Sequence, residues 1–237
     1  MSIDFSQRCT LPELMDDPHL SAEALQGTLK AISACNKWLG GNAITIRALK
    51  RFFKQYPDKK DWIIADVGCG DGEMLRLIAD AFKKKGLNIK LVGIDISEQG
   101  IALGKKASVA YPNIHFECTD VLILNKDTFA CDIILCTLTL HHLDSITIVA
   151  FLRQFVQLAR MGVLINDLQR SVLSYRLFKL ISSIFIKSPV AKYDGLISIR
   201  SGFKRHDFLN FSKTMALQNH RILWKWAFRY LWVIKTI

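Results

Sequence analysis

Apolar and polar positions divide the chain into a helical N-terminal part, a central alternation of strands and helices, and a basic C-terminal part. In the first part, apolar residues at helical spacing predict a helix from residue 21, and Gly40-Gly41 ends it. These apolar residues are Leu25, Leu29, Ile32 and Leu39. A second, basic helix is predicted over residues 43–55, before Pro57.

The central part alternates short apolar runs with amphipathic stretches. Strands are predicted over residues 62–67, 90–96, 114–121, 132–140 and 163–168. Helices are predicted between them over residues 73–85, from residue 97 to Tyr111, and over residues 145–160, where Met161-Gly162 ends the last one. Strands separated by helices in this rhythm are typical of a parallel, doubly wound α/β sheet.

The rhythm breaks after Leu168. Residues 171–187 are both basic and very apolar, and we expect core packing to be the main role of their leucines. Three further roles stay open for this stretch: a lid over a greasy acceptor, an interfacial helix on an anionic membrane, and a docking face for an acidic carrier protein. Residues 220–236 predict two late strands rich in aromatic and β-branched side chains.

The basic excess is confined to the C-terminal third. Residues 168–237 hold 13 Lys or Arg and 2 Asp or Glu, whereas residues 1–167 hold 19 of each kind. A patch of this kind attracts anionic lipid, nucleic acid or an acidic carrier protein.

The cysteines and the N-terminus bear on compartment. Six cysteines form no C-x-x-C pair and have no histidine at metal-ligand spacing, so we expect reduced thiols and no metal site. Residues 1–4 lack the charged-then-apolar start of a secretory signal, and no uncharged apolar run approaches the length of a membrane span. The prediction is a cytoplasmic protein, with peripheral membrane attachment left open.

A glycine-rich turn follows the first predicted strand and precedes a helix: Asp66-Val67-Gly68-Cys69-Gly70-Asp71-Gly72. Glu73 stands where a dinucleotide-binding fingerprint has Gly or Ala, and no Gly-Lys-Ser/Thr of a P-loop follows. The carboxylates of Asp66, Asp71 and Glu73 would repel a pyrophosphate. They favour a ligand with positive charge, such as S-adenosylmethionine (SAM), which has an ammonium, a sulfonium and no phosphate.

The next strand ends carry further acids. Asp95 lies about 20 residues beyond the glycines, where a carboxylate can bond both hydroxyls of a ribose. Ile96 can then lie against an adenine face, and Asp120-Val121 offers an acceptor for an exocyclic amine beside an apolar surface. Any one of these acids could be an ordinary helix cap or turn residue. That explanation is weaker for a set of acids that follow successive strands.

These segments, together with Gly93-Ile94-Asp95, Thr119-Asp120-Val121 and residues 131–143, resemble the class I SAM-dependent methyltransferase family over roughly residues 61–168. The resemblance implies a seven-stranded, Rossmann-like sheet whose last strand is antiparallel. It also implies that the backbone around Gly68, Cys69, Gly70 and Gly72 approaches the methionine part of SAM, and that Cys136-Thr137 line the same pocket. Residues 36–41 and 166–171 look like a bacterial subgroup of small-molecule methyltransferases associated with polyketide or pigment-type pathways.

Chemistry beyond the cofactor is expected near His141 and His142, which follow the fourth strand. One of them, His142 favoured, is predicted to position or deprotonate the acceptor; the alternative is that they order the loop. Asn166, Asp167 and Arg170 are substrate candidates at the end of the fifth strand, although turn chemistry and solvation explain them too.

The sequence as a whole therefore predicts an N-terminal helical cap over residues 1–58 and a SAM-binding domain over residues 59–237, with a helical lid around residues 171–205. The expected function is methyl transfer to a small, lipophilic, free or carrier-bound acceptor, with O-methylation favoured over C-methylation. A nucleic-acid methyltransferase or RNA-binding protein is disfavoured because Cys136-Thr137-Leu138-Thr139 replaces an Asn/Asp-Pro-Pro-Tyr-like base pocket. A non-catalytic SAM-binding scaffold is the remaining alternative.

Overall fold

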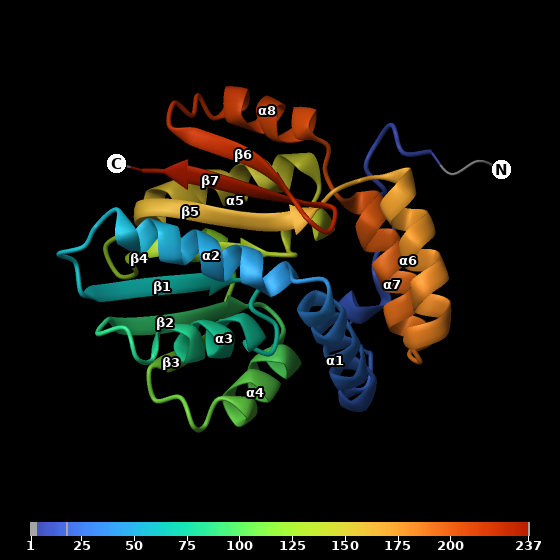
Figure 1. Ribbon diagram of the computed structural model, residues 1–237, viewed down its shortest axis with the longest axis horizontal. Helices are drawn as coiled ribbons and strands as arrows, with labels where there is room; N and C mark the ends of the chain where they lie inside the picture. Colours follow the sequence, from blue (N-terminus) through green and yellow to red (C-terminus); the bar gives the residue numbers. More distant parts are fainter. Residues whose placement is uncertain (1–3, 18, 237) are drawn as a thin grey trace.

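The protein is built around one seven-stranded sheet with the strand order β3-β2-β1-β4-β5-β7-β6 (Figure 1). The computed structural model describes residues 4–17 and 19–236; residues 1–3, which enter the prediction about a targeting signal, lie outside the described residues. The strands are β1 (Asp61–Val67), β2 (Asn88–Asp95), β3 (Ile114–Cys118), β4 (Cys131–Thr137), β5 (Ala159–Leu168), β6 (His220–Lys225) and β7 (Arg229–Lys235).

The strand directions confirm the predicted fold class. β1 to β5 pair in parallel, whereas β7 pairs antiparallel with both β5 and β6. The two late strands predicted over residues 220–236 are therefore the strands that complete the doubly wound sheet. Because the carboxyl ends of β1, β2, β4 and β5 meet at one edge, the loops that follow them share a single region of the molecule.

Helices cover both faces of the sheet. α2 (Gly41–Lys54), α3 (Glu73–Phe82) and α4 (Glu98–Ala107) pack on one face, in a core that includes Trp62 and Leu75. α5 (Ser145–Leu158) and α8 (Arg205–Thr214) pack on the other, in a core that includes Phe155 and Trp232. α3 shows why such segments are helical, since its buried residues recur every three or four positions: Met74, Leu75, Ile78 and Phe82.

Several predicted boundaries differ from the structure, and those of β5 and β3 show why. β5 begins at Ala159, so Gly162 lies inside the strand and does not end a helix. A Cβ at Gly162 would lie 2.7 Å from the backbone oxygen of Ile234, so the glycine allows β7 to approach closely. β3 ends at Cys118, and Asp120 caps a 3-10 turn (Val121–Ile123) beyond it.

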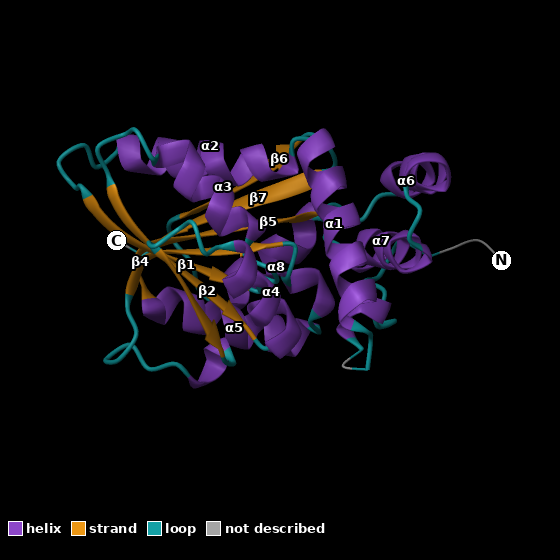
Figure 2. Cartoon of the chain, turned by 90° about the horizontal axis from the view of Figure 1, so that it is seen from below, coloured by secondary structure: helices purple, strands orange, loops and turns teal. Residues whose placement is uncertain are grey.

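Three helices gather beyond the carboxyl ends of the parallel strands: α1 (Ala22–Trp38), α6 (Val172–Phe185) and α7 (Pro189–Ser201) (Figures 1 and 2). α7 packs against both α1 and α6, and also against a 3-10 turn (Leu14–Asp16) near the N-terminus. The predicted helical insertion after β5 is thus present. The boundaries of the predicted cap and lid stay predictions.

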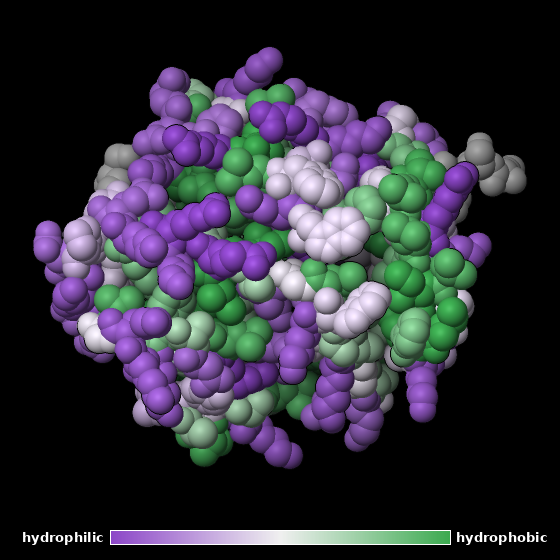
Figure 3. Space-filling view, viewed as in Figure 1, coloured by the Kyte–Doolittle hydropathy of each residue, from purple (hydrophilic) through white to green (hydrophobic). Residues whose placement is uncertain are grey.

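α6 presents apolar side chains to solvent rather than to the core. Leu173, Leu177, Leu180 and Ile184 are exposed and follow one another at helical spacing, so the prediction that they pack in the core is wrong. Apolar surface gathers over this part of the molecule in the space-filling view (Figure 3). Among the described residues, no helix combines the length and the apolar character needed to span a membrane.

Candidate active site

The glycine-rich turn after β1 forms a tight backbone cradle. Gly68, Gly70 and Gly72 all have positive φ angles, of 72°, 53° and 73°, which glycine adopts without strain. A side chain at Gly68 would run into Thr139, and a Cβ at Gly72 would lie 2.5 Å from the ring of Phe116. The amide of Gly68 donates to the carbonyl oxygen of Ile94, 2.8 Å away, which holds the turn against β2.

Asp66 brings a buried carboxylate to this cradle. It is 2% exposed, and its Oδ1 has no hydrogen-bond partner within the described part of the chain. Burial, and then the charge of Asp95, raises the pKa of Asp66 to about 8. A buried carboxyl oxygen without a partner is costly unless a ligand supplies a donor or a positive charge.

Asp95 ties the end of β2 to the glycine turn. Its Oδ2 accepts from the amide of Gly70 at 2.7 Å, and its Oδ1 accepts from the amide of Ser97 at 2.9 Å. Ile96 beside it is 76% exposed. Both residues lie at the predicted edge of the sheet, and their contacts with a nucleoside stay predictions.

The electrostatic argument for the loop needs a correction. Asp71 forms an ion pair with Arg76 at 3.1 Å, and Glu73 accepts hydrogen bonds from Ser33 and Asn42. Arg76 therefore balances the charge of Asp71, whereas Glu73 is held by neutral donors. Among the described residues, Asp95 and Glu73 have no such cationic partner, and burial beside Asp95 favours the protonated form of Asp66 until a cationic ligand binds.

Other predicted cofactor residues take different positions. Cys69, Val121 and Cys136 are buried in the hydrophobic cores. The side chain of Cys136 therefore does not line an open pocket, contrary to the prediction. Thr137 is half-buried, with its hydroxyl 3.5 Å from that of Thr45. Asp120 is half-buried and accepts from the amide of Leu122 at 2.9 Å, as a turn residue does.

The two histidines lie on a 3-10 turn (Leu140–His142) after β4 and meet carboxylates on several sides. Nδ1 of His141 is 2.7 Å from Oδ1 of Asp167, and its Nε2 is 3.4 Å from Oε1 of Glu13. Nδ1 of His142 is 2.8 Å from Oδ2 of Asp16, and its Nε2 is 3.9 Å from Oε2 of Glu13. Three carboxylates, two from the N-terminal segment and one from β5, therefore surround one pair of imidazoles.

These contacts separate the two histidines chemically. His141 is buried, which alone would lower its pKa, but the charges and hydrogen bonds of Asp167 and Glu13 raise it to about 10. A histidine that holds its proton this firmly and has both nitrogens engaged is a poor general base. The side chain of His142 is 20% exposed, so His142 is the one that an acceptor can reach.

An N-terminal segment completes this cluster, which sequence reasoning missed. Glu13 is buried and accepts from the hydroxyl of Ser198 on α7 at 2.5 Å. Arg8 donates to the backbone oxygens of His141 at 3.0 Å and Leu143 at 2.8 Å. The residues lie more than 120 positions apart in the sequence, and no local pattern around Glu13 could have indicated the contact.

The predicted substrate residues differ in accessibility. Asn166 is buried and donates to the carbonyl of Gly41 at 3.1 Å and the hydroxyl of Thr45 at 3.0 Å. Asp167 is fully buried beside His141. Arg170 is wrong as a substrate contact, because it is 2% exposed and its guanidinium donates to several groups of the protein: Phe5, Ser6, Gly202 and Asp207.

Arg229 at the start of β7 is a further charged residue that the sequence did not single out. It is 3% exposed, and its Nη2 donates to Oδ1 of Asn36 at 2.6 Å. Burial, opposed by the charge of Asp167, lowers the pKa of Arg229 to about 10. Its Nη1, Oδ1 of Asn166 and Oδ2 of Asp167 have no hydrogen-bond partner among residues 4–17 and 19–236.

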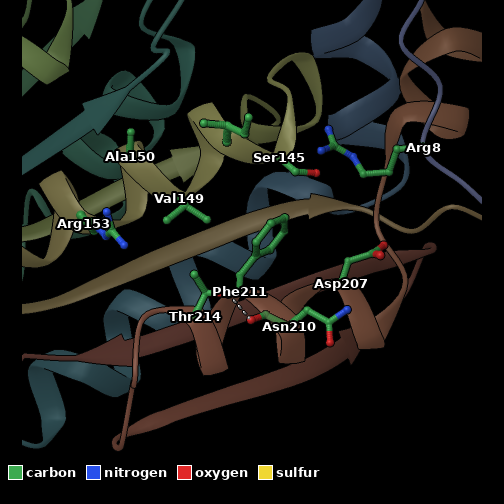
Figure 4. Close-up of a pocket in the computed structure, with 10 residues that line it drawn as sticks. Arg8, Ser145, Val149, Ala150, Arg153, Asp207, Asn210, Phe211 and Thr214 are labelled. Carbon is green, nitrogen blue, oxygen red and sulfur yellow. Dashed lines mark hydrogen bonds between the residues drawn. The ribbon is translucent and has the colours of Figure 1, made fainter.

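A separate groove of about 560 Å³ lies between α5 and α8 (Figure 4). Arg8 stands at one end of it and Arg153 at the other, with Val149 and Phe211 between them. No residue predicted to bind cofactor or acceptor lines this groove, so it is distinct from the glycine cradle.

Comparison with known proteins agrees with this geometry. A family model described as a methyltransferase domain matches residues 64–162, from β1 into β5. The fold is that of the class I SAM-dependent methyltransferases. The plantazolicin methyltransferase BpumL, solved with S-adenosylhomocysteine (SAH) and a triazolic analogue, has this fold at a TM-score of 0.66 and 18% identity, covering 90% of this chain and 95% of its own. Magnesium protoporphyrin IX methyltransferase from Synechocystis PCC 6803, solved with SAH, has a TM-score of 0.55 at 16% identity, with 82% and 83% of the two chains covered.

A curated relative supports the same methyltransferase domain. The ubiquinone biosynthesis O-methyltransferase of Coxiella burnetii is 36% identical over 93 residues, which are 39% of this chain and 37% of that protein. The match thus spans less than two-fifths of the relative's length. The resemblance inferred from the sequence is confirmed over residues 64–162, whereas α6 and α7 lie beyond the family match.

Proposed function

We propose that the protein transfers a methyl group from SAM to a small, lipophilic acceptor. The observation that carries the proposal is the carboxylate of Asp66, buried without a partner for Oδ1 beside a backbone cradle in which side chains do not fit. This combination fits a cofactor that carries cationic groups and no phosphate. Asp66 and the glycine turn lie within residues 64–162, the segment that matches the methyltransferase domain model.

The residues of this chain would divide the work of binding. Asp66 would attract the cationic part of the cofactor, the Gly68–Gly72 turn would admit it closely, and Asp95 would meet the ribose. The cofactor supplies a methyl group already activated by sulfonium, so the protein has mainly to align the acceptor and exclude water.

O-methylation is favoured over C-methylation. The relative from Coxiella is named an O-methyltransferase. At the carboxyl end of β5, where Arg229 pairs with Leu168, Nη1 of Arg229 is a buried donor without a partner among the described residues. A buried guanidinium of this kind would stabilise an anionic or phenolic oxygen, which is the nucleophile of O-methylation.

His142 is the better of the two histidines for positioning or deprotonating the acceptor. Its Nδ1 is fixed by Asp16, while its side chain remains partly exposed. His141 orders the turn through its contacts with Asp167 and Glu13. Of the three substrate candidates, Asn166 and Asp167 stay in the proposal and Arg170 is withdrawn.

α6 is proposed to rest on an anionic membrane surface, where a lipophilic acceptor would be found. Leu173, Leu180 and Ile184 are 57%, 63% and 69% exposed. Arg176 and Lys179 are exposed on the same helix. Exposed apolar side chains flanked by cations suit an interface with acidic lipid better than they suit nucleic acid.

The burial of two arginines also weakens the alternative that the protein binds or methylates nucleic acid. Arg170 and Arg229, which contribute to the basic excess of the C-terminal third, are buried and bonded to the protein. They are therefore unavailable to neutralise phosphates.

Calorimetry with SAM tests the central proposal, and the absence of binding by the purified protein would overturn it. Mass spectrometry would then look for the gain of one methyl group on phenolic, quinone-like and carrier-bound candidates. Binding of SAM without transfer to any candidate class would support the non-catalytic scaffold instead.

A further inference from the structure

Three side chains from two distant parts of the chain point their potential metal-binding atoms at one another. The ligand atoms of Glu13, His141 and His142 all lie within 4.8 Å of one another, and Glu13 and His141 are buried. The two imidazole rings lie side by side, with their centroids 4.3 Å apart and their planes 36° apart. Each ring directs its Nε2 toward the carboxylate of Glu13.

The hydrogen bonds behind the two rings are those of metal-bound histidines. Metal-ligating histidines nearly always donate their other ring nitrogen to a carboxylate or a carbonyl, which fixes the tautomer and the ring orientation. Here Nδ1 of His141 lies 2.7 Å from Asp167, and Nδ1 of His142 lies 2.8 Å from Asp16. Both Nε2 atoms are left to share the space in front of Glu13.

The charges and distances point the same way. Three carboxylates surround the rings, those of Glu13, Asp16 and Asp167. A divalent cation would balance more of this negative charge than one proton on His141 does. Bonds of about 2 Å to a tetrahedral Zn²⁺ require about 3.3 Å between donors. Nε2 of His141 lies 3.4 Å from Oε1 of Glu13, and Nε2 of His142 lies 3.9 Å from Oε2. One donor atom from each residue can be chosen so that all three lie within 4.8 Å of one another, and the side chains would close in around a cation to reach the shorter separation.

We infer that Glu13, His141 and His142 form a binding site for a divalent transition-metal cation of the Zn²⁺ class. Two imidazoles and one carboxylate are the ligand set of open zinc sites, and the partly exposed His142 leaves room for a fourth ligand. The bound cation would fasten residues 13–16 to the turn after β4, beside α7. Ser198 and Asp194 on α7 already hold this segment by bonds to Glu13 and to the amides of Leu14 and Met15.

The site goes beyond the proposed methyl transfer and does not depend on it. Nε2 of His142 cannot bind a cation and accept a proton at once. In the metal-bound protein, the cation rather than His142 would activate the acceptor, since a cation can lower the pKa of an oxygen that it binds. The deprotonating role proposed for His142 belongs to the metal-free protein.

Metal titration of the full chain tests the inference. The protein is first stripped of metal with a chelator. It is then titrated with Co²⁺, whose visible absorption reports tetrahedral coordination, and Zn²⁺ is added as a competitor. We expect one cation per chain and a higher melting temperature on binding. His142→Asn and Glu13→Gln should each weaken binding at least about 100-fold, and Asp16→Asn about 10-fold.

His115→Asn is the matched control, because His115 is an exposed histidine on β3, away from the cluster. It should bind Co²⁺ as the unchanged protein does. The inference is overturned if the stripped protein takes up no Co²⁺ or Zn²⁺, or if E13Q and H142N bind them as tightly as the unchanged chain. SAM calorimetry on the same samples separates the two proposals, since metal binding without SAM binding refutes only the methyl transfer, and the reverse refutes only the metal site.

Discussion

Asp167 and His141 join the end of β5 to the turn after β4 through a contact of 2.7 Å between Oδ1 and Nδ1. The same carboxylate also influences Arg229 electrostatically, on the β7 side. Its other oxygen, Oδ2, is buried without a partner among the described residues. Asp167 thus links the histidine cluster to the buried guanidinium of Arg229. A substitution at His141 or Arg229 should therefore shift the pKa of the other residue.

The protonation of Asp66 should control cofactor affinity. Burial and Asp95 raise the pKa of Asp66 to about 8, so at neutral pH the free protein carries this carboxyl largely protonated. A cationic cofactor favours the ionised form, and binding should therefore release a proton. We expect the affinity for SAM to rise with pH up to about 8 and then level off. Calorimetry in buffers of different ionisation enthalpy measures the release, and Asp66→Asn should bind weakly with a flatter pH dependence.

The same residue should affect stability with the opposite trend. The pKa of Asp66 in the folded protein, about 8, lies above its ordinary value of 3.8. The contribution of Asp66 to the free energy of unfolding is therefore fully present below pH 3.8 and is lost as the pH rises toward 8. Denaturant unfolding of the cofactor-free protein should show a free energy of unfolding that declines over this window. In Asp66→Asn this part of the decline should disappear; an identical pH dependence in both proteins would refute the assignment.

Gly68→Ala should damage the cofactor cradle. The substitution places a side chain at a φ of 72° and against Thr139, whose hydroxyl lies 3.4 Å from the backbone oxygens of Val67 and Gly68. We expect a loss of about 1–3 kcal/mol in stability and a larger loss of SAM affinity. Gly27→Ala is the control, because nothing lies within 4 Å of its Cβ position in α1. It should keep SAM affinity and raise helix stability slightly.

Arg229→Met should weaken binding of the acceptor more than binding of the cofactor. Removing the guanidinium takes away a charge-assisted donor, and we expect the KM for an anionic or phenolic acceptor to rise about 10- to 100-fold. The Kd for SAM should stay within a few-fold of the original. Arg221→Met, at an exposed site on the neighbouring strand, removes the same charge without a buried contact. Equal effects of the two substitutions would show that only net charge matters.

The exposed stripe of α6 should bind vesicles. Flotation with phosphatidylglycerol vesicles at low salt should carry the protein upward, and added salt should weaken this because Arg176 and Lys179 contribute. Leu180→Glu combined with Ile184→Glu should abolish flotation without lowering the melting temperature, since both sites are exposed. Val109→Glu is the control, because Val109 is 85% exposed and lies outside α6. Flotation that survives the double substitution would refute the role of α6.

The sheet and the cofactor loop could be predicted because their signals are local. The apolar strand before Gly68, and the acid after each of the next two strands, can each be recognised within a few residues of sequence. The final two strands were also predictable from their aromatic and β-branched residues. The prediction erred at Gly162, because a glycine that ends a helix and one that admits a neighbouring strand look alike in sequence.

The acceptor side could not be predicted in the same way. Arg170 and Arg229 are both buried, yet all three guanidinium nitrogens of Arg170 donate to groups of the protein, whereas Nη1 of Arg229 has no partner among the described residues. Glu13 meets His141 only because η1 (Leu14–Asp16) packs on α7. Such contacts depend on how helices from distant parts of the chain pack, which periodicity does not specify.

The two roles open to His142 make different predictions for one set of proteins. If His142 acts as a free base, chelator-stripped protein should methylate its acceptor as fast as metal-loaded protein, and His142→Asn should lower the rate about 100-fold or more. If it binds a cation, stripping should lower the rate, and Zn²⁺ should restore it in the unchanged chain but not in H142N. Glu13→Gln decides between them, because it removes a metal ligand and leaves His142 in place. The inferred metal site requires E13Q to respond to Zn²⁺ as H142N does, whereas a free base requires E13Q to stay active without metal.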